Sequence, residues 1–452
     1  MPVTMANVSG PDLCGALEDD ARTLAELVGP AEEELAGLPL PGLRDEAQRQ
    51  LAASLVDSCR RARTAFLHRH APAVYDALTD RRRTPLRLAE LARAGAERFP
   101  GLLPTDAQMA EEATRTQADK EGREIDQGIF FRALLADPSV GEHLIDSMLA
   151  PTPRALGLLS VFRAEGRVDL GAVLLERRDD VAHLTLNNQH CLNAEDNRLI
   201  DDLETAVDLV LLDDQISVGV VRGGVMTHPR YTGRRVFCAG INLKDLHAGR
   251  ISFVDFLLRR ELGYINKLMH GLLVDPSPDA YPERTLHKPW LAVVDSFAIG
   301  GGMQLLLVFD HVIAADDAFL SLPAAQEGIV PGLGNFRLSR MTGARLARRV
   351  ILGGRRIRTT DPEAALVCDE VVASQAMDAA VEKAVRELAA PAVLANRMML
   401  NLADEPRDGL RRYLAEFALV QARRLYAADV MAKVGRFSTP SVRQPADGGH
   451  AP

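Results

Sequence analysis

The segment Lys288–Gly332 constrains the fold more than any other stretch of this chain. It contains an apolar run, Trp290–Val294, then three consecutive glycines, Gly300, Gly301 and Gly302, and it continues directly into an apolar helical run. Glycine allows backbone conformations that other residues resist, and the start of a helix presents unpaired N–H groups. The pattern therefore predicts a strand-to-helix turn that can hold a negatively charged oxygen.

Strand-like and helix-like runs alternate from about Gly171 onward. Five short apolar runs have the pattern of strands, over residues 172–176, 181–186, 217–221, 290–294 and 311–315. Apolar residues recur at helical spacing between them, over residues 194–212, 252–274 and 303–309. This alternation is typical of α/β folds, so we expect an α/β core over residues 166–375.

The two ends of the chain lack strand patterns. Residues 1–165 carry apolar residues at helical spacing, as in Leu24 and Val28, and predict an all-helical N-terminal domain that covers the pocket or packs between subunits. Residues 376–435 are helical in pattern again, and we expect a C-terminal oligomerisation region there. Residues 436–452 are rich in Pro, Gly and Ser and predict a disordered tail.

Composition and charge exclude several classes of protein. Acidic residues number 62 against 53 basic ones, and the net charge of −9 is unlike that of a nucleic-acid-binding protein. No apolar run reaches the ~20 residues of a membrane span, and the start of the chain lacks the pattern of a secretory signal. The five cysteines are scattered, and the histidines form no recognisable ligand motif. We therefore expect a cytoplasmic protein that binds no nucleic acid, no membrane and no metal.

A second glycine-containing turn, Phe237–Leu243, follows a strand-like run. Its glycine, Gly240, would let this turn present a second amide N–H to the same oxygen as the first turn. Two N–H groups that converge on one oxygen form an oxyanion hole, which stabilises an enolate. Close packing of helices also explains a single glycine turn, so the pair is more informative than either turn alone.

These motifs occur in the order found in the crotonase (enoyl-CoA hydratase/isomerase) superfamily, which the chain resembles over residues 170–375. The resemblance also includes Ile329–Gly332 and the closing segment Thr359–Val371. It implies a ββα spiral core, an acyl-CoA thioester ligand, a homotrimer or dimer of trimers, and an oxyanion hole from the N–H groups of Ile241 and Gly301. It further implies substrate contacts at the neighbouring residues Ala239, Gly240, Asn242, Leu243 and Gly302.

Two positions depart from the pattern of the hydratases in that superfamily. Those enzymes carry two glutamates for water addition, and the matching positions here are Gln304 and Ala324. Neither an amide nor a methyl group acts as a general base at neutral pH. Glu327 could substitute, although a structural carboxylate near a turn is the other interpretation. Without a strong base the substrate must supply its own acidity, as an arylacetyl thioester does by delocalising the carbanion into its ring.

The helical N-terminal region, the two replacements and the insert Thr227–Tyr231 are similar to an oxygen-consuming branch of the superfamily. That resemblance implies an arylacetyl-CoA with two ring hydroxyl groups as substrate and O2 as co-substrate. It implies no metal, flavin or nicotinamide cofactor, and the sequence has no Gly-X-Gly-X-X-Gly after a strand. In this reaction the enolate passes an electron to O2, and the resulting peroxide attacks the thioester and releases CoA.

Arg260 is the first candidate for recognising the ring hydroxyl groups. It falls on the apolar stripe of Leu257 and Tyr264, where a charge requires a ligand or a buried carboxylate as partner. Both explanations stay open at this point. Arg259 lies off the stripe, and we expect it to form a surface pair with Asp255.

Glu195 is the second candidate for contacting the ring. Ordinary helix-end electrostatics also explains it, with Asn193 as N-cap and acidic residues in the first turn. Gln304 could bind the substrate or position O2, or it could simply start a helix without a functional role.

Further contacts are expected outside these groups. We expect one polar cluster to line the path of the substrate or CoA, and a solvated loop is the other interpretation. The cluster comprises His228, Pro229, Arg230 and Tyr231. The candidates for contacts with CoA, by family pattern, are Asn188, Lys244 and Arg337.

Two other functions stay open from the sequence. One is an acyl-CoA isomerase, hydrolase or hydratase with relocated acid and base groups, in which Glu195 or Glu327 is the base. The other is a catalytically silent CoA-binding scaffold, which would explain the missing glutamates. Retention of both oxyanion turns weighs against a scaffold, and O2 uptake distinguishes the dioxygenase from the other enzymes.

Overall fold

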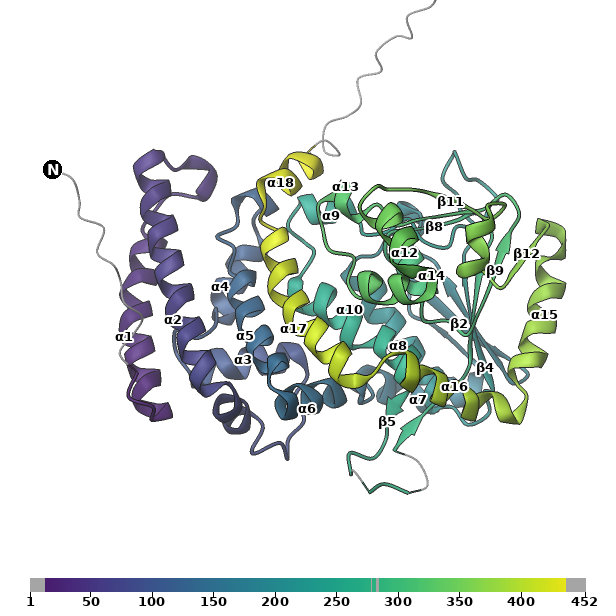
Figure 1. The fold of residues 1–452 in the computed structure, drawn as a ribbon, viewed down its shortest axis with the longest axis horizontal. Helices are drawn as coiled ribbons and strands as arrows, with labels where there is room; N and C mark the ends of the chain where they lie inside the picture. Colours follow the sequence, from purple (N-terminus) through teal and green to yellow (C-terminus); the bar gives the residue numbers. More distant parts are fainter. Residues whose placement is uncertain (1–12, 278, 282–283, 436–452) are drawn as a thin grey trace, which may run out of the picture.

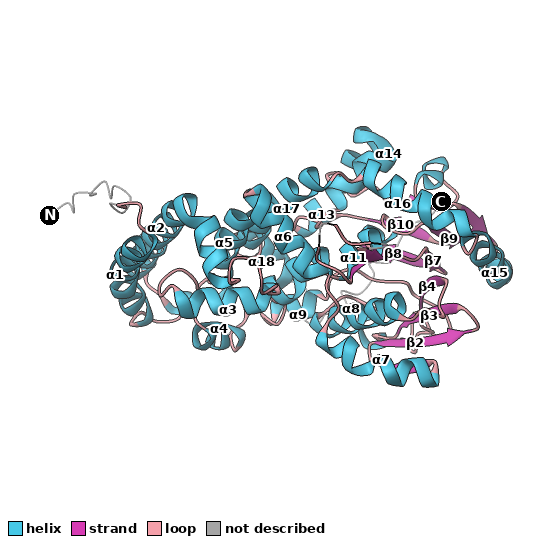
Figure 2. Cartoon of the chain, turned by 90° about the horizontal axis from the view of Figure 1, so that it is seen from below, coloured by secondary structure: helices cyan, strands magenta, loops and turns pink. Residues whose placement is uncertain are grey.

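The computed structural model describes residues 13–277, 279–281 and 284–435. The N-terminal helices lie at one end of the molecule and the β-sheets at the other, and a C-terminal helix runs between them (Figure 1). Seen from below, the strands are grouped at one end, with helices beside them (Figure 2). The predicted tail at 436–452 lies outside the described residues.

From residue 13 onward, seven α-helices form the N-terminal part. They are α1 (Leu17–Ala36), α2 (Glu46–Leu78), α3 (Leu88–Arg98), α4 (Asp106–Ala113), α5 (Glu124–Ala136), α6 (Pro138–Leu149) and α7 (Pro153–Glu165), with short 3-10 turns at Pro41–Leu43 and Gln117–Asp119. Capping residues in the sequence set the starts of several helices. At the start of α2 the Asp45 side chain accepts from the Gln48 amide, and the Gln48 side chain accepts from the Asp45 amide. The predicted helical character of this region is confirmed.

The main sheet has seven strands in the order β1-β2-β3-β4-β7-β9-β12. Its strands are β1 (Arg167–Asp169), β2 (Val173–Arg178), β3 (Val181–Leu186), β4 (Val218–Gly223), β7 (Trp290–Val294), β9 (His311–Ala315) and β12 (Glu370–Val372). β1 to β3 pair antiparallel, and the pairs from β3 onward are parallel. All five residues of β7 are buried, as a central parallel strand requires. The α/β prediction is confirmed.

A three-stranded sheet carries the first glycine turn. It has the order β11-β10-β8, from β8 (Phe297–Ile299), β10 (Phe319–Ser321) and β11 (Ile357–Arg358), and a small hairpin pairs β5 (Leu272–Leu273) with β6 (Thr285–Leu286). β8 leads through Gly300, at φ 54° and ψ −117°, into α12 (Gly301–Leu306). The strand, glycine turn and helix predicted for this segment are therefore present, although the helix begins two residues earlier than expected.

Helices fill the connections of the core. They are η3 (Gln189–Cys191), α8 (Asn197–Leu212), α9 (Leu243–His247), η4 (Phe253–Leu258), α10 (Arg259–Leu262), α11 (Tyr264–His270), α13 (Ala324–Glu327), α14 (Gly334–Ile351), η5 (Pro362–Leu366) and η6 (Ser374–Ala376). The predicted single helix over 252–274 is wrong. The segment starts as a π-helix, η4, and breaks at Gly263, whose φ of −89° and ψ of −111° are not helical. Gly263 lies so close to Glu204 that a Cβ there would be 2.9 Å from its Oε1.

Four helices end the described part of the chain: α15 (Met377–Leu388), α16 (Pro391–Asp404), α17 (Arg407–Arg424) and α18 (Ala428–Gly435). α17 returns to the N-terminal part and packs along α5 (Figure 1), where a Cβ at Gly128 would lie 2.7 Å from the Ala422 Cβ. The boundaries expected after 165 and 375 fall between α7 and β1 and just before α15. That these parts are separate domains stays a prediction. In the described part of the chain, no helix has the length and apolar character of a membrane span.

Candidate active site

The two glycine turns meet as predicted. Cys238 and Ala298 form a parallel bridge, and the Ile299 amide donates to the Cys238 carbonyl at 2.9 Å. The turns touch so closely that a Cβ at Gly300 would lie 3.1 Å from the Gly240 Cα. Only residues without side chains permit this approach.

The amides of Ile241 and Gly301 are available to a ligand. Both residues line the same cavity, and among the hydrogen bonds of the described residues neither amide N–H donates to a protein acceptor. The second turn is also held by Glu195, whose amide donates to Gly240 at 2.7 Å and whose carbonyl accepts from Asn242 at 2.8 Å. This geometry suits an oxyanion hole.

Glu195 and Arg260 form a buried ion pair beside the Gly301 turn. Arg260 Nε lies 2.9 and 3.0 Å from the two carboxylate oxygens of Glu195, and Arg260 Nη2 donates to the Gly301 carbonyl at 2.8 Å. The Tyr264 hydroxyl donates to Glu195 Oε1 at 3.1 Å. A Cβ at Gly301 would lie only 1.8 Å from Glu195 Oε2, so glycine is required there. The buried carboxylate partner expected for Arg260 is present, and Arg260 also lines the cavity. Its contact with a ligand stays a prediction.

Glu261 is a site residue that the sequence analysis missed. Its Oε1 accepts from Arg260 Nη1 at 2.7 Å and from Gln304 Nε2 at 2.6 Å, and its Oε2 accepts from the Leu333 amide at 3.1 Å. Glu261 thus connects α10, α12 and the turn before α14 in one cluster. The only sequence signal was its place beside Arg260 in a largely apolar segment.

Burial shapes the ionisation of this cluster. Burial raises the pKa of Glu195, although Arg260 and Tyr264 act in the opposite direction. Burial alone would lower the pKa of Arg260, but Glu195, together with Tyr264 and Glu261, raises that pKa above its ordinary value. Burial also raises the pKa of Tyr264 well above its ordinary value, so its hydroxyl keeps its proton. A permanent cation therefore sits between two buried carboxyl groups.

A small cavity of about 40 Å³ lies in front of the two amides. Its apolar lining comprises Phe256, Leu257, Leu322, Ala324, Ile329, Val330 and Phe417, and its polar side chains are Glu195, Arg260, Glu261, Gln304 and Glu327. A larger cavity of about 480 Å³ shares Ile329, Val330 and Pro331 with it. No residue from 1–165 is part of the small cavity's lining, so within the described residues the N-terminal helices do not cover the pocket directly.

The polar cluster at 228–231 lies away from this cavity. His228, Pro229 and Arg230 are exposed, and Tyr231 packs against Phe297 with ring centroids 5.4 Å apart. None of the four lines the cavity, so their role along the path of the substrate or CoA stays a prediction.

The residues beside the oxyanion turns have structural partners. Asn242 accepts from the Asp245 amide at 3.3 Å and caps α9, and a Cβ at Gly302 would lie 2.6 Å from the Cys238 Cβ. Ala239 and Leu243 are half-buried, and neither of them lines the cavity. Their contacts with substrate stay predictions.

Of the three predicted contacts with CoA, the one assigned to Arg337 is wrong. It is buried, and its Nε and Nη2 donate to Glu405 at 2.8 and 2.9 Å, which removes it from any exposed phosphate. Lys244 is exposed, and Asn188 is buried with its amide donating to the Ala194 carbonyl at 3.0 Å. The roles of Lys244 and Asn188 toward CoA stay predictions.

Two expected pairings are also corrected. Asp196, not Asn193, caps α8 by accepting from the Leu199 amide at 2.9 Å, while Asn193 donates to the Val236 carbonyl. Arg259 does not pair with Asp255 on the surface. It donates instead to buried Glu204 at 2.6 Å and to Asp201 at 2.8 Å.

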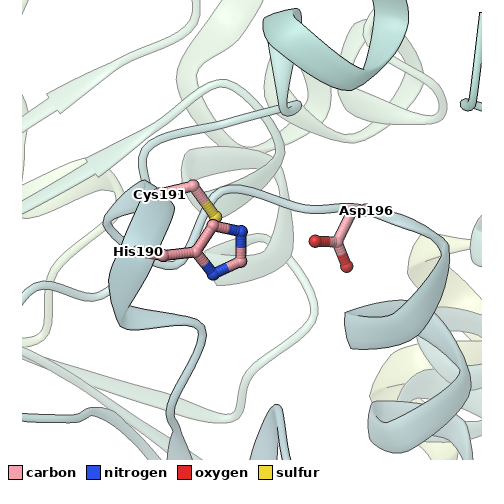
Figure 3. Close-up of side chains that lie close together, drawn as sticks. All are labelled: His190, Cys191 and Asp196. Atoms are coloured by element: carbon pink, nitrogen blue, oxygen red, sulfur yellow. The ribbon is translucent and has the colours of Figure 1, made fainter. Parts of the chain in front are cut away.

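His190, Cys191 and Asp196 lie close together, with potential ligand atoms within 4.8 Å of one another (Figure 3). Both carboxylate oxygens of Asp196 already accept hydrogen bonds, from Leu199 and from Asn188. Burial, with Asp196 nearby, raises the pKa of Cys191 to about 12, so the thiol stays protonated. A protonated thiol and an engaged carboxylate fit a metal ion poorly.

The chain is similar to known proteins over much of its length. The enoyl-CoA hydratase/isomerase family profile matches residues 282–421. A solved enoyl-CoA hydratase from Mycobacterium avium subsp. paratuberculosis K-10 superposes with a TM-score of 0.49 at 19% identity, covering 59% of this chain and 98% of its own. The chain is 27% identical to 2,3-dehydroadipyl-CoA hydratase of Escherichia coli, over 57% of this chain and 89% of that protein.

The chain belongs to the enoyl-CoA hydratase/isomerase (crotonase) family. Within that family it is 60% identical to (3,5-dihydroxyphenyl)acetyl-CoA 1,2-dioxygenase of Amycolatopsis orientalis. The match extends over 422 residues, which are 93% of this chain and 96% of the relative. The similarity therefore includes most of the N-terminal helices as well as the core.

Proposed function

We propose that this protein is a dioxygenase that converts (3,5-dihydroxyphenyl)acetyl-CoA and O2 to 3,5-dihydroxyphenylglyoxylate and CoA. The observation that carries the proposal is the 60% identity to the enzyme of that name over nearly the whole of both chains. The site supports it, because two unpaired amides face a cavity in which Gln304 and Ala324 occupy the positions of the hydratase glutamates.

The first step is formation of the enolate. Loss of one proton from the carbon between ring and thioester places negative charge on the thioester oxygen, where the amides of Ile241 and Gly301 receive it. The aryl ring delocalises the same charge, which lowers the demand for a strong base. Glu195 and Glu261 are both held by Arg260 and are better placed to bind ring hydroxyl groups than to shuttle protons.

The later steps balance without an added reductant. O2 takes electrons from the enolate and bonds to the same carbon, and the terminal peroxide oxygen attacks the thioester carbonyl and expels CoA thiolate. The O–O bond then breaks as the remaining proton leaves that carbon. One oxygen atom ends in the ketone and the other in the carboxylate, so the substrate carbon is oxidised by four electrons and O2 is reduced by four.

The proposal includes independence from metal, flavin and nicotinamide, because the electrons come from the substrate itself. It also includes a cytoplasmic homotrimer or dimer of trimers, and a place in glycopeptide antibiotic biosynthesis. Four apolar side chains on α16 are more than 40% exposed and support a subunit contact there, namely Met398, Met399, Leu400 and Leu402.

The test is O2 consumption by the purified protein with (3,5-dihydroxyphenyl)acetyl-CoA, in excess chelator, together with CoA release. We expect one O2 per CoA, and with 18O2 we expect both labelled atoms in the glyoxylate. Phenylacetyl-CoA, which lacks both ring hydroxyl groups, is the matched control and should react far more slowly. CoA release without O2 uptake would establish a hydrolase, and binding without turnover would establish a silent CoA-binding protein.

A further inference from the structure

One short segment supplies much of the cavity wall. Phe256 and Leu257 of η4 and Arg260 and Glu261 of α10 all line the cavity. The segment consists of a π-helix, four α-helical residues and a break at Gly263. It therefore contains little regular helix that could hold its shape. Its placement therefore depends on what contacts it from outside.

The N-terminal helices hold the start of the segment. η4 contacts α3 and α5. The amide of Phe253, the first residue of η4, donates to Glu124 Oε1 of α5 at 2.8 Å. That amide has no partner within its own helix, so a buried carboxylate satisfies it from another part of the chain. Glu124 is only 2% exposed, and its Oε2 accepts from the Tyr426 hydroxyl at 2.5 Å.

The same helices hold the end of the segment through Glu204. This fully buried carboxylate of α8 accepts from Arg259 Nε at 2.6 Å and from Lys267 Nζ at 2.9 Å, and its third partner is Arg87 at the start of α3. Burial opposes ionisation of Glu204, but Lys267, Arg87 and Arg259 together hold its pKa below the ordinary value. Arg259 is the neighbour of Arg260, so this ionic link ends one residue from the cavity.

We propose that Glu124 and Arg87 are positioning residues, through which the N-terminal helices hold Arg260 in the geometry that recognises the ring hydroxyl groups. Neither residue lines the cavity; each acts on it through the segment Phe253–Leu262. The inference rests on the proposed function, because it assigns the two residues to selection of that substrate. It gives the N-terminal helices a role in specificity rather than in covering the pocket.

The test is binding without oxygen, where the substrate is not consumed. The full-length variants are Glu124→Ala and Arg87→Ala, and the ligands are (3,5-dihydroxyphenyl)acetyl-CoA and phenylacetyl-CoA. We expect the affinity for the dihydroxyphenyl ligand to fall about tenfold, while that for phenylacetyl-CoA changes less than about twofold. A purely structural role would lower the folded fraction and weaken both ligands together.

Two matched controls break contacts in which no residue of the segment Phe253–Leu262 takes part. Glu112 is a buried carboxylate of α4 that accepts from the Glu121 amide at 2.6 Å, and Arg407 pairs with Asp146 between the C-terminal and N-terminal helices. Glu112→Ala and Arg407→Ala should preserve the ratio of the two affinities. Glu124→Asp and Arg87→Lys keep the charges and should give intermediate losses, which keeps the test open if an alanine variant does not fold.

The outcomes separate the two proposals. Equal weakening of both ligands, or the same loss in the control variants, would overturn the positioning role. If the wild-type protein consumes O2 and prefers the dihydroxyphenyl ligand, and the variants keep that full preference, the positioning role is overturned. The proposal of a dioxygenase then stands. A wild-type protein that does not discriminate between the ligands would overturn the ring recognition, and the positioning role with it.

Discussion

Replacement of Glu261 by glutamine tests the buried cluster directly. The carboxylate accepts three hydrogen bonds, from Arg260 and Gln304 on one oxygen and from the Leu333 amide on the other. A glutamine of the same shape has one acceptor oxygen and one NH2 group. Whichever way it turns, its NH2 faces a donor, so at least one buried donor loses its partner.

The loss can be sized from these contacts. In the less costly orientation the amide oxygen keeps Arg260 and Gln304, and only the Leu333 amide is left unpaired, at about 1–3 kcal/mol. The bond from Arg260 also loses a full negative charge as acceptor, which removes roughly 1 kcal/mol more. A total of about 2–4 kcal/mol is too large to be absorbed without movement of Arg260 or Gln304.

We expect Glu261→Gln to lower kcat/KM for (3,5-dihydroxyphenyl)acetyl-CoA by roughly 10- to 100-fold, measured as initial O2 uptake with quantified CoA release. Thermal unfolding followed by circular dichroism shows whether the variant is folded, and Glu112→Gln serves as the buried carboxylate control. A folded Glu261→Gln protein with kcat/KM within twofold of wild type would refute the interpretation of Glu261 as the connection within the cluster.

Three further predictions follow from the same structure. Gly301→Ala should reduce kcat by about 100-fold or more, because the new methyl group would lie 1.8 Å from Glu195 Oε2; unchanged turnover would disprove the oxyanion role of this turn. Arg260→Ala should weaken aryl-CoA binding and also destabilise the fold by about 3–5 kcal/mol, since two buried carboxylates lose their cationic partner; denaturant unfolding and anaerobic titration measure the two effects. Burial lowers the pKa of Lys288 from 10.5 to about 8, so the unfolded chain binds more protons above pH 8. The stability of wild type relative to Lys288→Met should therefore rise by up to about 3 kcal/mol between pH 8 and 10.5, and a flat difference in urea unfolding across that range would contradict it.

The sequence predicted those parts of the site that depend on short-range pattern. Both turns were identified by their glycines, which are Gly300 to Gly302 after an apolar strand and Gly240 before Ile241. Only glycine permits such close backbone approaches. Arg260 stood out because a charge on an apolar stripe needs a partner. Its partner Glu195 was also named, as a candidate for contacting the ring or as a helix-start residue, but not as the bridge residue beside Ile241 that it is.

The errors come from contacts between distant segments. Arg337 has Glu405, 68 residues away, as its partner, and nothing near Arg337 in the sequence indicates that α16 ends beside it. Arg259 was paired with Asp255, an acidic residue one helical turn away, whereas its partners lie on α8. The π-helical start of η4 and the break at Gly263 were invisible to a search for α-helical spacing, and Glu261 was missed with them.

The packing of α17 against α5 has a consequence for synthesis of the chain. α17 also holds the loop before α14, because Tyr413 donates to the Gly332 carbonyl at 2.6 Å and Gln421 accepts from the Val330 amide at 2.8 Å. Roughly 290 residues separate the end of α5 at residue 136 from the end of α17 at residue 424. At ~5–20 residues per second, a ribosome needs about 15–60 s to make them. During that time the apolar face of α5 is bare and the cavity lacks a wall, so the nascent chain is open to chaperones and to aggregation until the last helices emerge.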